Sequence, residues 1–222
     1  MLSSPLAKVK LFCYNIASFM PKKIKGRRGL LVVISGPSGV GKSTVVKKLL
    51  SIYPKLKLSM SATTRPPRPN EVHNRDYQFI TEEEFFDRVK KGNFLEWAQV
   101  HGYYYGTPKL FIEEELGRNH AVVSEVDVQG AASIKEAVSL SKIKGSAVFI
   151  FLIPPSVDIL AFRLRRRKTE NEEVVNYRLR AAIAELQVME KYDYIVVNDK
   201  VDSAAEKIKA IINVEKERGL LN

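Results

Sequence analysis

The clearest chemical signal in the chain is a short glycine-rich segment. Residues 36–43 read Gly-Pro-Ser-Gly-Val-Gly-Lys-Ser, which matches the G-x-x-x-x-G-K-[ST] pattern of loops that bind nucleoside triphosphates. The glycines let successive backbone N–H groups turn toward one anion. Lys42 can reach the β- and γ-phosphates, and the Ser43 hydroxyl can ligate Mg²⁺. The predicted triphosphate site consists of Gly36, Pro37, Ser38, Gly39, Val40, Gly41, Lys42, Ser43 and Thr44.

A second group of side chains has the chemistry of a nucleotide acceptor site. Arg65 and Arg68 stand three positions apart in a proline-rich stretch, and Tyr77, Glu96 and Tyr105 follow. Arginine forks and tyrosine hydroxyls suit a phosphate dianion, and a partly buried carboxylate suits a base that presents adjacent N–H donors. Each residue taken alone also has an ordinary interpretation, as a solvated arginine, a packed tyrosine or a salt-bridged carboxylate. Their combination favours the acceptor site.

Two further charged groups, Asp127 and the arginines of residues 163–167, also allow both a functional and an ordinary interpretation. Asp127 directly follows the predicted core strand at 121–126, and ligands gather at such strand ends in open α/β sheets. Residues 163–167 are rich in arginine, and the ordinary interpretation of such a run is a solvated basic helix. We keep that interpretation for Arg165 and Arg166.

The elements that position these groups follow from hydrophobic periodicity. Short β-branched runs alternate with amphipathic runs of helix length. Strands are expected at 30–35, 58–61, 121–126, 147–153 and 194–198. Helices are expected at 42–53, between Thr81 and Gly92, from Thr107 to Gly117, at 172–191, and from a cap at Ser203 onward. The pattern predicts an α/β fold with an open parallel sheet flanked by helices. The glycine-rich segment then lies between a strand and a helix, which is the context that a phosphate-binding loop requires.

Composition narrows the class of protein. The chain has 222 residues, of which 45% are hydrophobic, enough for one buried core. Cys13 is the only cysteine, which excludes an intrachain disulfide and fits a reducing, cytoplasmic location. The net charge is +11, but residues 1–28 carry seven positive charges and no acid, which leaves +4 for the rest. This distribution favours small phosphorylated ligands over nucleic acid.

The first 28 residues allow three interpretations. No stretch of the chain is long and apolar enough to span a bilayer, so no membrane partner is expected. We expect residues 1–28 to be a flexible extension without a catalytic role. A cleaved targeting peptide, or a true start at Met20, are the alternatives.

These motifs resemble the guanylate kinase family. The likeness runs from Leu31 to the final helix. Besides the glycine-rich loop, it rests on Ser61-Ala62-Thr63-Thr64-Arg65-Pro66-Pro67-Arg68, Asp76-Tyr77-Gln78-Phe79, Phe94-Leu95-Glu96-Trp97-Ala98 and Tyr103-Tyr104-Tyr105-Gly106-Thr107-Pro108. Asn70 and Asn74 stand where the family usually has glycine, but asparagine tolerates left-handed backbone angles better than most residues.

The resemblance implies a role for each candidate residue. It implies that the GMP phosphate is bound by Arg65, Arg68, Tyr77 and Tyr105. It implies that guanine is read by Ser61, Glu96 and Thr107, with Asp127 near GMP and the water shell of the metal. Glu125 stands where aspartate is more usual, so its role is left open. The arginines of the lid that closes over the triphosphate would be Arg163, Arg167 and Arg178.

The resemblance also implies an activity and a domain organisation. The activity is ATP- and Mg²⁺-dependent phosphorylation of GMP, and of dGMP, by in-line transfer, for purine nucleotide recycling and GTP supply. The implied parts are an extension at 1–28 and a kinase domain at 29–222, with a core of 29–61, 117–156 and 176–222, a GMP-binding insertion at 62–116 and a lid at 157–175. A non-catalytic interaction domain, and a kinase for another small acceptor, are the alternatives. The oligomeric state is left open.

Overall fold

A five-stranded parallel sheet forms the centre of the fold. The computed structural model describes residues 29–100, 102–166 and 172–221. The strand order is β2-β7-β1-β8-β9, and every neighbouring pair is parallel. The strands are β1 (Leu30–Ser35), β2 (Lys57–Leu58), β7 (Ala121–Glu125), β8 (Ala147–Ile153) and β9 (Tyr194–Val197). The prediction of an open parallel sheet flanked by helices is confirmed.

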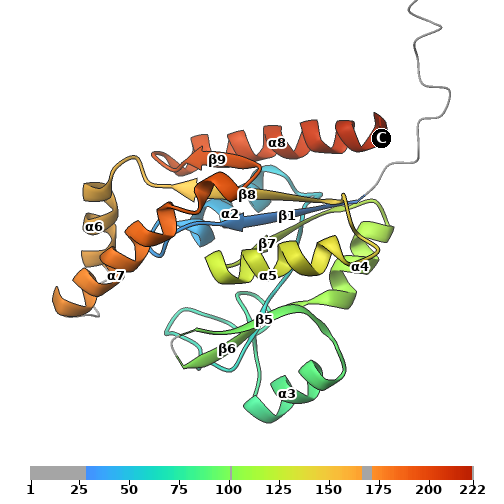
Figure 1. Cartoon of the computed structure of the whole chain (residues 1–222), viewed down its shortest axis with the longest axis horizontal. Coiled ribbons are helices and arrows are strands. Elements are labelled where there is room, and N and C mark those ends of the chain that lie inside the picture. Colours follow the sequence, from blue (N-terminus) through green and yellow to red (C-terminus); the bar gives the residue numbers. More distant parts are fainter. Residues whose placement is uncertain (1–28, 101, 167–171, 222) are drawn as a thin grey trace, which may run out of the picture.

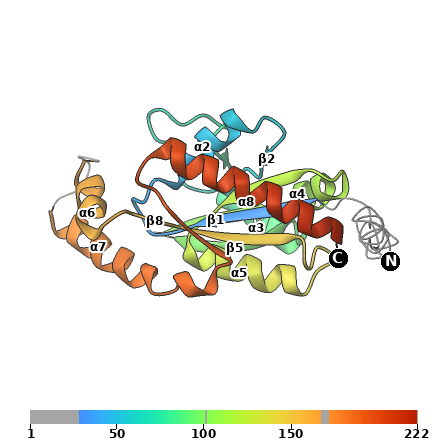
Figure 2. The ribbon, with the colours of Figure 1, turned by 90° about the horizontal axis from the view of Figure 1, so that it is seen from above.

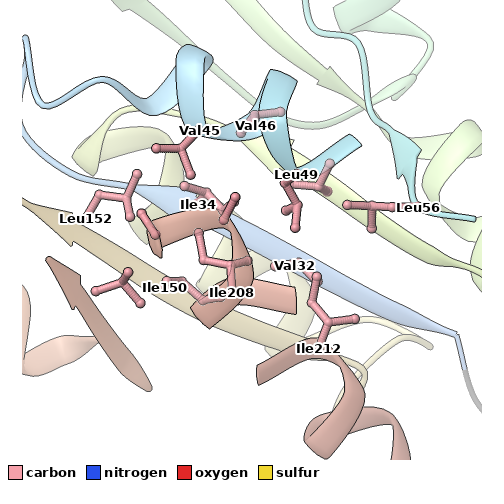
Figure 3. Close-up of a cluster of buried hydrophobic side chains, with 14 of the residues drawn as sticks. Val32, Ile34, Val45, Val46, Leu49, Leu56, Ile150, Leu152, Ile208 and Ile212 are labelled. Carbon is pink, nitrogen blue, oxygen red and sulfur yellow. The ribbon is translucent and has the colours of Figure 1, made fainter. Parts of the chain in front are cut away.

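Helices cover both faces of this sheet (Figures 1 and 2). One face packs against α2 (Lys42–Ile52) and α8 (Val201–Leu221), and the other packs against α4 (Lys109–Gly117) and α5 (Val128–Ser139). All six residues of β1 are buried, because side chains that alternate along a central strand enter the two hydrophobic layers in turn. Val32 and Ile34 point toward the layer that contains Ile208 and Ile212 of α8 (Figure 3).

A smaller, four-stranded sheet lies beside the main one (Figure 1). Its order is β4-β3-β6-β5, and its strands are β3 (Ala62–Thr63), β4 (Gln78–Phe79), β5 (Phe94–Val100) and β6 (Tyr103–Pro108). Helix α3 (Glu82–Lys90) packs on it through the fully buried Phe85, whose ring stacks on Phe94 with centroids 4.8 Å apart. Aromatic packing therefore gives this sheet a small hydrophobic core of its own.

The last two helices before β9 lie at one end of the main sheet (Figure 1). They are α6 (Val157–Arg165) and α7 (Glu172–Leu186), and a short 3₁₀ turn, η1 (Met189–Lys191), follows α7. Ser156 caps α6 by accepting a hydrogen bond from the Ile159 N–H at 3.2 Å. Among the helices in the part of the chain that the structure describes, none has the length and apolar character needed to cross a bilayer.

Several local predictions are confirmed and others need correction. Thr81 caps α3 by accepting a hydrogen bond from the Glu84 N–H, and Asn74 has the left-handed φ of 61° that the sequence allows. Ser203 does not begin the last helix. The Ala204 N–H already donates to the Lys200 carbonyl, so α8 begins at Val201.

Three element boundaries also differ from the prediction. Of the strand expected at 58–61, only Leu58 belongs to a strand, β2 of the main sheet, and β3 of the smaller sheet begins at Ala62. Thr107 belongs to β6, because it pairs with Glu96 across that sheet, and α4 starts only at Lys109. The helix expected at 172–191 ends at Leu186 and is followed by η1.

Candidate functional site

A cavity of about 180 Å³ joins the two sheets at the carboxyl end of β7. The main sheet contributes Glu125 and the residues just after it, and the smaller sheet contributes β5 and β6. The sequence-predicted residues that line the cavity are Lys42, Ser61, Tyr77, Glu96, Tyr105 and Asp127. Residues from the predicted triphosphate site and the predicted acceptor site thus face one space.

The glycine-rich loop connects β1 to α2 and has the backbone form of a phosphate cradle. Gly41 caps α2 with a φ of 96°, and a Cβ at Gly36 would lie 2.4 Å from the Leu152 carbonyl oxygen, so both positions require glycine. The N-terminus of α2 faces this loop and favours negative charge. The Lys42 Nζ lies over the loop and donates to the carbonyls of Gly36 at 2.6 Å and Pro37 at 3.3 Å.

Ser43 is the first-turn residue whose hydroxyl was predicted to ligate a metal. The hydroxyl donates to Glu125 Oε1 at 2.6 Å, which joins α2 to the carboxyl end of β7. Burial raises the pKa of Glu125, while this hydrogen bond and the charge of Lys42 act in the opposite direction. A hydroxyl beside a carboxylate is a set of hard oxygen donors that suits Mg²⁺. The only sequence signal for Glu125 was its position at the end of a core strand, and it was not placed among the site residues.

Arg65, one of the two arginines predicted to bind the acceptor phosphate, is held by aromatic residues. Arg65 Nε donates to the Tyr105 hydroxyl at 3.2 Å, and its guanidinium carbon lies 5.7 Å from the centre of the Tyr77 ring. Burial raises the pKa of Tyr77 to about 12, so its hydroxyl stays protonated and can donate. Arg68 lies outside the small cavity. It lines an adjoining space of about 780 Å³, and its side chain is 66% exposed.

Glu96 is a buried carboxylate in the wall of the cavity. This residue is 9% exposed, and the Thr107 hydroxyl donates to its Oε1 at 2.6 Å. Burial raises the pKa of Glu96 to about 7, and the charge of Asp127 adds to this effect, while the hydrogen bond from Thr107 opposes it. Asp127 also caps α5 by accepting the Gly130 N–H at 2.7 Å. Two carboxylates therefore face the space in which a base with N–H donors would lie.

Gly130 is a site residue that the sequence analysis missed. A Cβ there would approach Asp127 Oδ1 at 3.2 Å and Glu96 Oε2 at 3.5 Å. The small residue keeps the cavity open next to both carboxylates. Its position three residues after Asp127 was the only available signal, and the packing that makes it necessary is tertiary.

Two of the three predicted lid arginines reach the glycine-rich loop. Arg163 donates to the carbonyls of Val40 at 3.2 Å and Asn198 at 3.0 Å, and Arg178 Nη2 donates to the Ser38 hydroxyl at 2.7 Å. Arg167, the third predicted arginine, lies outside the described residues. Arg165 forms an ion pair with Glu172 at the surface, which agrees with its interpretation as a solvated residue.

Asn198 supports the glycine-rich loop through a hydrogen bond. It is 2% exposed, and its Nδ2 donates to the Val40 carbonyl at 2.7 Å. It follows β9 directly, so the last strand of the sheet fixes the loop between the first strand and α2. From the sequence, position 198 was expected only to end a core strand, and Asn198 was assigned no role in the site.

Comparison with known proteins agrees with this geometry. The family model described as guanylate kinase matches residues 28–215. A guanylate kinase of Caldanaerobacter subterraneus subsp. tengcongensis is 48% identical over 190 residues, which cover 86% of this chain and 89% of that protein. A guanylate kinase of Thermotoga maritima is 45% identical over 189 residues, or 85% of this chain and 88% of that protein.

The structural comparison gives the same family. The crystal structure of guanylate kinase from Anaplasma phagocytophilum superposes with a TM-score of 0.70 at 32% sequence identity, covering 86% of this chain and 87% of that one. With the match to the family model and the relatives above 30% identity over most of the sequence, these findings show that this chain belongs to the guanylate kinase family.

Proposed function

We propose that the protein transfers the terminal phosphoryl group of ATP to GMP, and also to dGMP, to form the diphosphate and ADP. The observation that carries the proposal is that Lys42 and Glu96 line the same cavity, together with Tyr77 and Tyr105. A triphosphate-binding lysine and a base-reading carboxylate in one space are what a nucleoside monophosphate kinase needs. An interaction domain without catalysis would not need the intact phosphate loop.

The donor nucleotide would be bound by residues 36–44. The backbone N–H groups and the Lys42 ammonium would hold the β- and γ-phosphates. Mg²⁺ fits the oxygens of Ser43 and Glu125, 2.6 Å apart, and when bound it supplies positive charge to the triphosphate. Among the described residues, no group of three or more His, Cys, Asp or Glu side chains could hold a metal ion, so we expect the phosphates and water to complete its coordination.

The acceptor nucleotide would be bound by the smaller sheet and the strand end opposite it. Arg65, Arg68, Tyr77 and Tyr105 would hold the phosphate of GMP, as donors suited to a dianion. Glu96 would accept from the ring N–H and the exocyclic amino group of guanine. Thr107, which donates to Glu96, and Ser61 and Asp127, which line the same cavity, would assist in reading the base. Adenine does not offer these two donors together, so AMP would leave the buried carboxylate with only the hydrogen bond from Thr107.

The chemical step needs countercharge and not a general base. A nucleoside monophosphate has a second pKa of about 6, so its phosphate is largely a dianion at neutral pH. An oxygen of this phosphate would attack the γ-phosphorus of ATP in line, and the bond to the β–γ bridging oxygen would break, leaving ADP. Lys42, Arg163, Arg167 and Arg178 would stabilise the charge on the transferring group.

Closure of the insertion and the lid belongs to the same proposal. We propose that residues 62–116 carry GMP toward the triphosphate and that residues 157–175 close over it. Two polyanions must be aligned while water is excluded, because water would otherwise accept the phosphoryl group. The reaction would serve purine nucleotide recycling in the cytoplasm.

The direct test is ADP release from ATP and Mg²⁺ with GMP, AMP, CMP or UMP as acceptor. We expect rapid release with GMP and at least about a hundredfold lower kcat/KM with the others, the selectivity of a site that hydrogen-bonds its substrate through buried groups. Equal rates with GMP and AMP would contradict the role of Glu96. Release that needs no acceptor would indicate hydrolysis instead.

A further inference from the structure

Glu71 is a charged residue to which the proposed reaction assigns no role. It lies between β3 and β4, and its carboxylate accepts two hydrogen bonds from Arg65 Nη2, at 3.0 and 2.8 Å. It accepts a third from the backbone N–H of Arg68 at 2.8 Å. The backbone N–H of Glu71 donates in turn to the Arg68 carbonyl at 3.0 Å. Glu71 is therefore tied to both of the arginines proposed to bind the acceptor phosphate.

The contacts of Arg65 show that the Glu71 carboxylate completes the set that orients its guanidinium. Arg65 Nη1 donates to the Pro66 carbonyl at 2.8 Å, and Nε donates to the Tyr105 hydroxyl. The rings of Tyr77 and Phe79 lie 5.7 and 5.8 Å from the guanidinium carbon. Because a guanidinium is planar and carries five N–H donors in fixed directions, contacts at all three nitrogens determine its orientation. Glu71 supplies the contacts at Nη2.

Arg65 and Glu71 form an ion pair that is largely shielded from water. The side chains of Arg65 and Glu71 are only 11% and 18% exposed. Burial acts to raise the pKa of Glu71, but the hydrogen bonds from the Arg68 backbone and from Arg65 outweigh it and hold that pKa below its usual value. The carboxyl group is thus charged at neutral pH. Removing the charge would leave a shielded guanidinium without its partner, which is costly.

We propose that Glu71 is the positioning residue of the acceptor-phosphate site. It holds the Arg65 guanidinium and the Arg68 backbone in the arrangement that receives the phosphate of GMP, and it stays in place when GMP binds. The inference rests on the proposed function. The opposite role would be a competing anion that the phosphate must displace. The hydrogen bonds within residues 68–71 favour positioning, because they anchor the carboxylate to its own loop independently of Arg65.

The test is the affinity of the E71Q variant for GMP and for guanosine, measured by calorimetry without ATP. Glutamine keeps the shape of glutamate but loses its charge and presents an amide N–H₂ to the guanidinium. We expect GMP to bind roughly tenfold or more weakly, the scale of a lost charged hydrogen bond. Guanosine, which has no phosphate, should bind as it does to the original protein, because Glu96 and Thr107 are unchanged.

The matched control is E84Q. Glu84 forms an ion pair with Arg88 at 2.6 Å within α3, in the same sheet-and-helix unit, but it lines neither cavity. This variant should bind GMP and guanosine normally. E71D, which keeps the charge on a shorter side chain, should lose less GMP affinity than E71Q.

The outcomes separate the possible roles of Glu71. Unchanged GMP affinity in E71Q would overturn the proposal, and tighter GMP binding would show that Glu71 competes with the phosphate. Equal losses for GMP and guanosine would show a general structural role and would also overturn it. If E71Q does not fold, the same comparison of GMP with guanosine in E71D decides the matter. Failure of the original protein to bind GMP would contradict the proposed function instead.

Discussion

The chemistry of the acceptor site depends on a carboxylate kept away from water. Glu96 is almost buried, accepts one hydrogen bond from Thr107 and lies near the charge of Asp127. A buried acceptor of this kind is costly when it has no donor partner. Guanine can supply two adjacent N–H donors, so in the proposed site a base that lacks them would leave Glu96 short of hydrogen bonds, and this cost would give selectivity for guanine.

The substitution Glu96→Gln tests this role directly. It should weaken GMP use by about 1–3 kcal/mol in kcat/KM, because the amide cannot accept both guanine donors. The KM for ATP should not change. Steady-state kinetics with each nucleotide varied in turn measures both effects, and Glu84→Gln serves as a control of equal charge change. A normal kcat/KM for GMP would be incompatible with base recognition by Glu96.

The pKa of Glu96 predicts a pH dependence of GMP affinity. Only the ionised carboxylate accepts both guanine donors, and this group has a pKa of about 7 in the ligand-free protein. Affinity should therefore be constant above pH 7 and fall by up to about tenfold for each unit below it. Measuring guanosine binding avoids the titration of the GMP phosphate. In Glu96→Gln this slope should disappear, and a slope of the same size in that variant would assign it to another group.

Lys42 is expected to act on turnover and not on acceptor binding. Its ammonium lies over the phosphate loop and is proposed to bind the triphosphate, not the guanine base. Lys42→Ala should lower kcat by roughly a hundredfold or more, while calorimetry should give a GMP affinity close to that of the original protein. Normal turnover of Lys42→Ala would show that the phosphate loop has no role in the mechanism.

At the scale of elements, the phosphate loop is held by segments that come late in the sequence. Asn198, at the end of β9, and Arg163 of α6 both donate to the Val40 carbonyl. Arg178 of α7 donates to Ser38. The positions of α6 and α7 are thus coupled to the conformation of the loop. The proposed closure of the lid over the triphosphate would act through these hydrogen bonds.

Removing the support at β9 should affect stability and the donor site together. Asn198→Ala deletes a buried hydrogen bond to Val40, so the free energy of unfolding should fall by about 1–3 kcal/mol, and the KM for ATP should rise. Urea unfolding and steady-state kinetics measure the two effects. The exposed Asn93 provides the control, since Asn93→Ala should change neither quantity. A loss of stability with an unchanged KM for ATP would separate Asn198 from the loop.

The sequence predicted the elements better than their contacts. The glycine-rich loop, the buried strand β1 and the cap at Thr81 follow local rules of backbone angle, periodicity and hydrogen bonding, and the structure has all three. The start of α8 at Val201 was missed because a capping-box pattern at Ser203 is only one of several ways to begin a helix.

The tertiary features of the site could not be predicted from the sequence. The exposed position of Arg68, the contact of Asn198 with Val40 and the need for glycine at position 130 depend on packing between distant segments. Hydrophobic periodicity carries no information on such contacts. The pairing of Glu71 with Arg65 could likewise not be predicted, although the two residues are only 6 positions apart.

At the scale of the whole molecule, two sheets of different construction share one cavity. The parallel sheet supplies the phosphate loop and the end of β7, and the smaller sheet supplies Glu96, Thr107 and the aromatic residues around Arg65. The smaller sheet has an aromatic cluster around Phe85, but Leu95 of β5 packs into the same buried cluster as Ile112 of α4 and Ile134 of α5, so the two sheets are also joined by hydrophobic contacts. In the proposed function, two nucleotides lie in this one cavity, one on each sheet.

The most direct test of this central claim is the inhibition pattern of a bisubstrate ligand, a guanosine and an adenosine joined through their 5′ positions by a chain of five phosphates. If both nucleotides occupy one chamber, the ligand should compete with ATP and with GMP alike, and should bind more tightly than either nucleotide alone because the second contact becomes intramolecular. Competition with only one of the two substrates would show that the donor and acceptor sites are not joined as described.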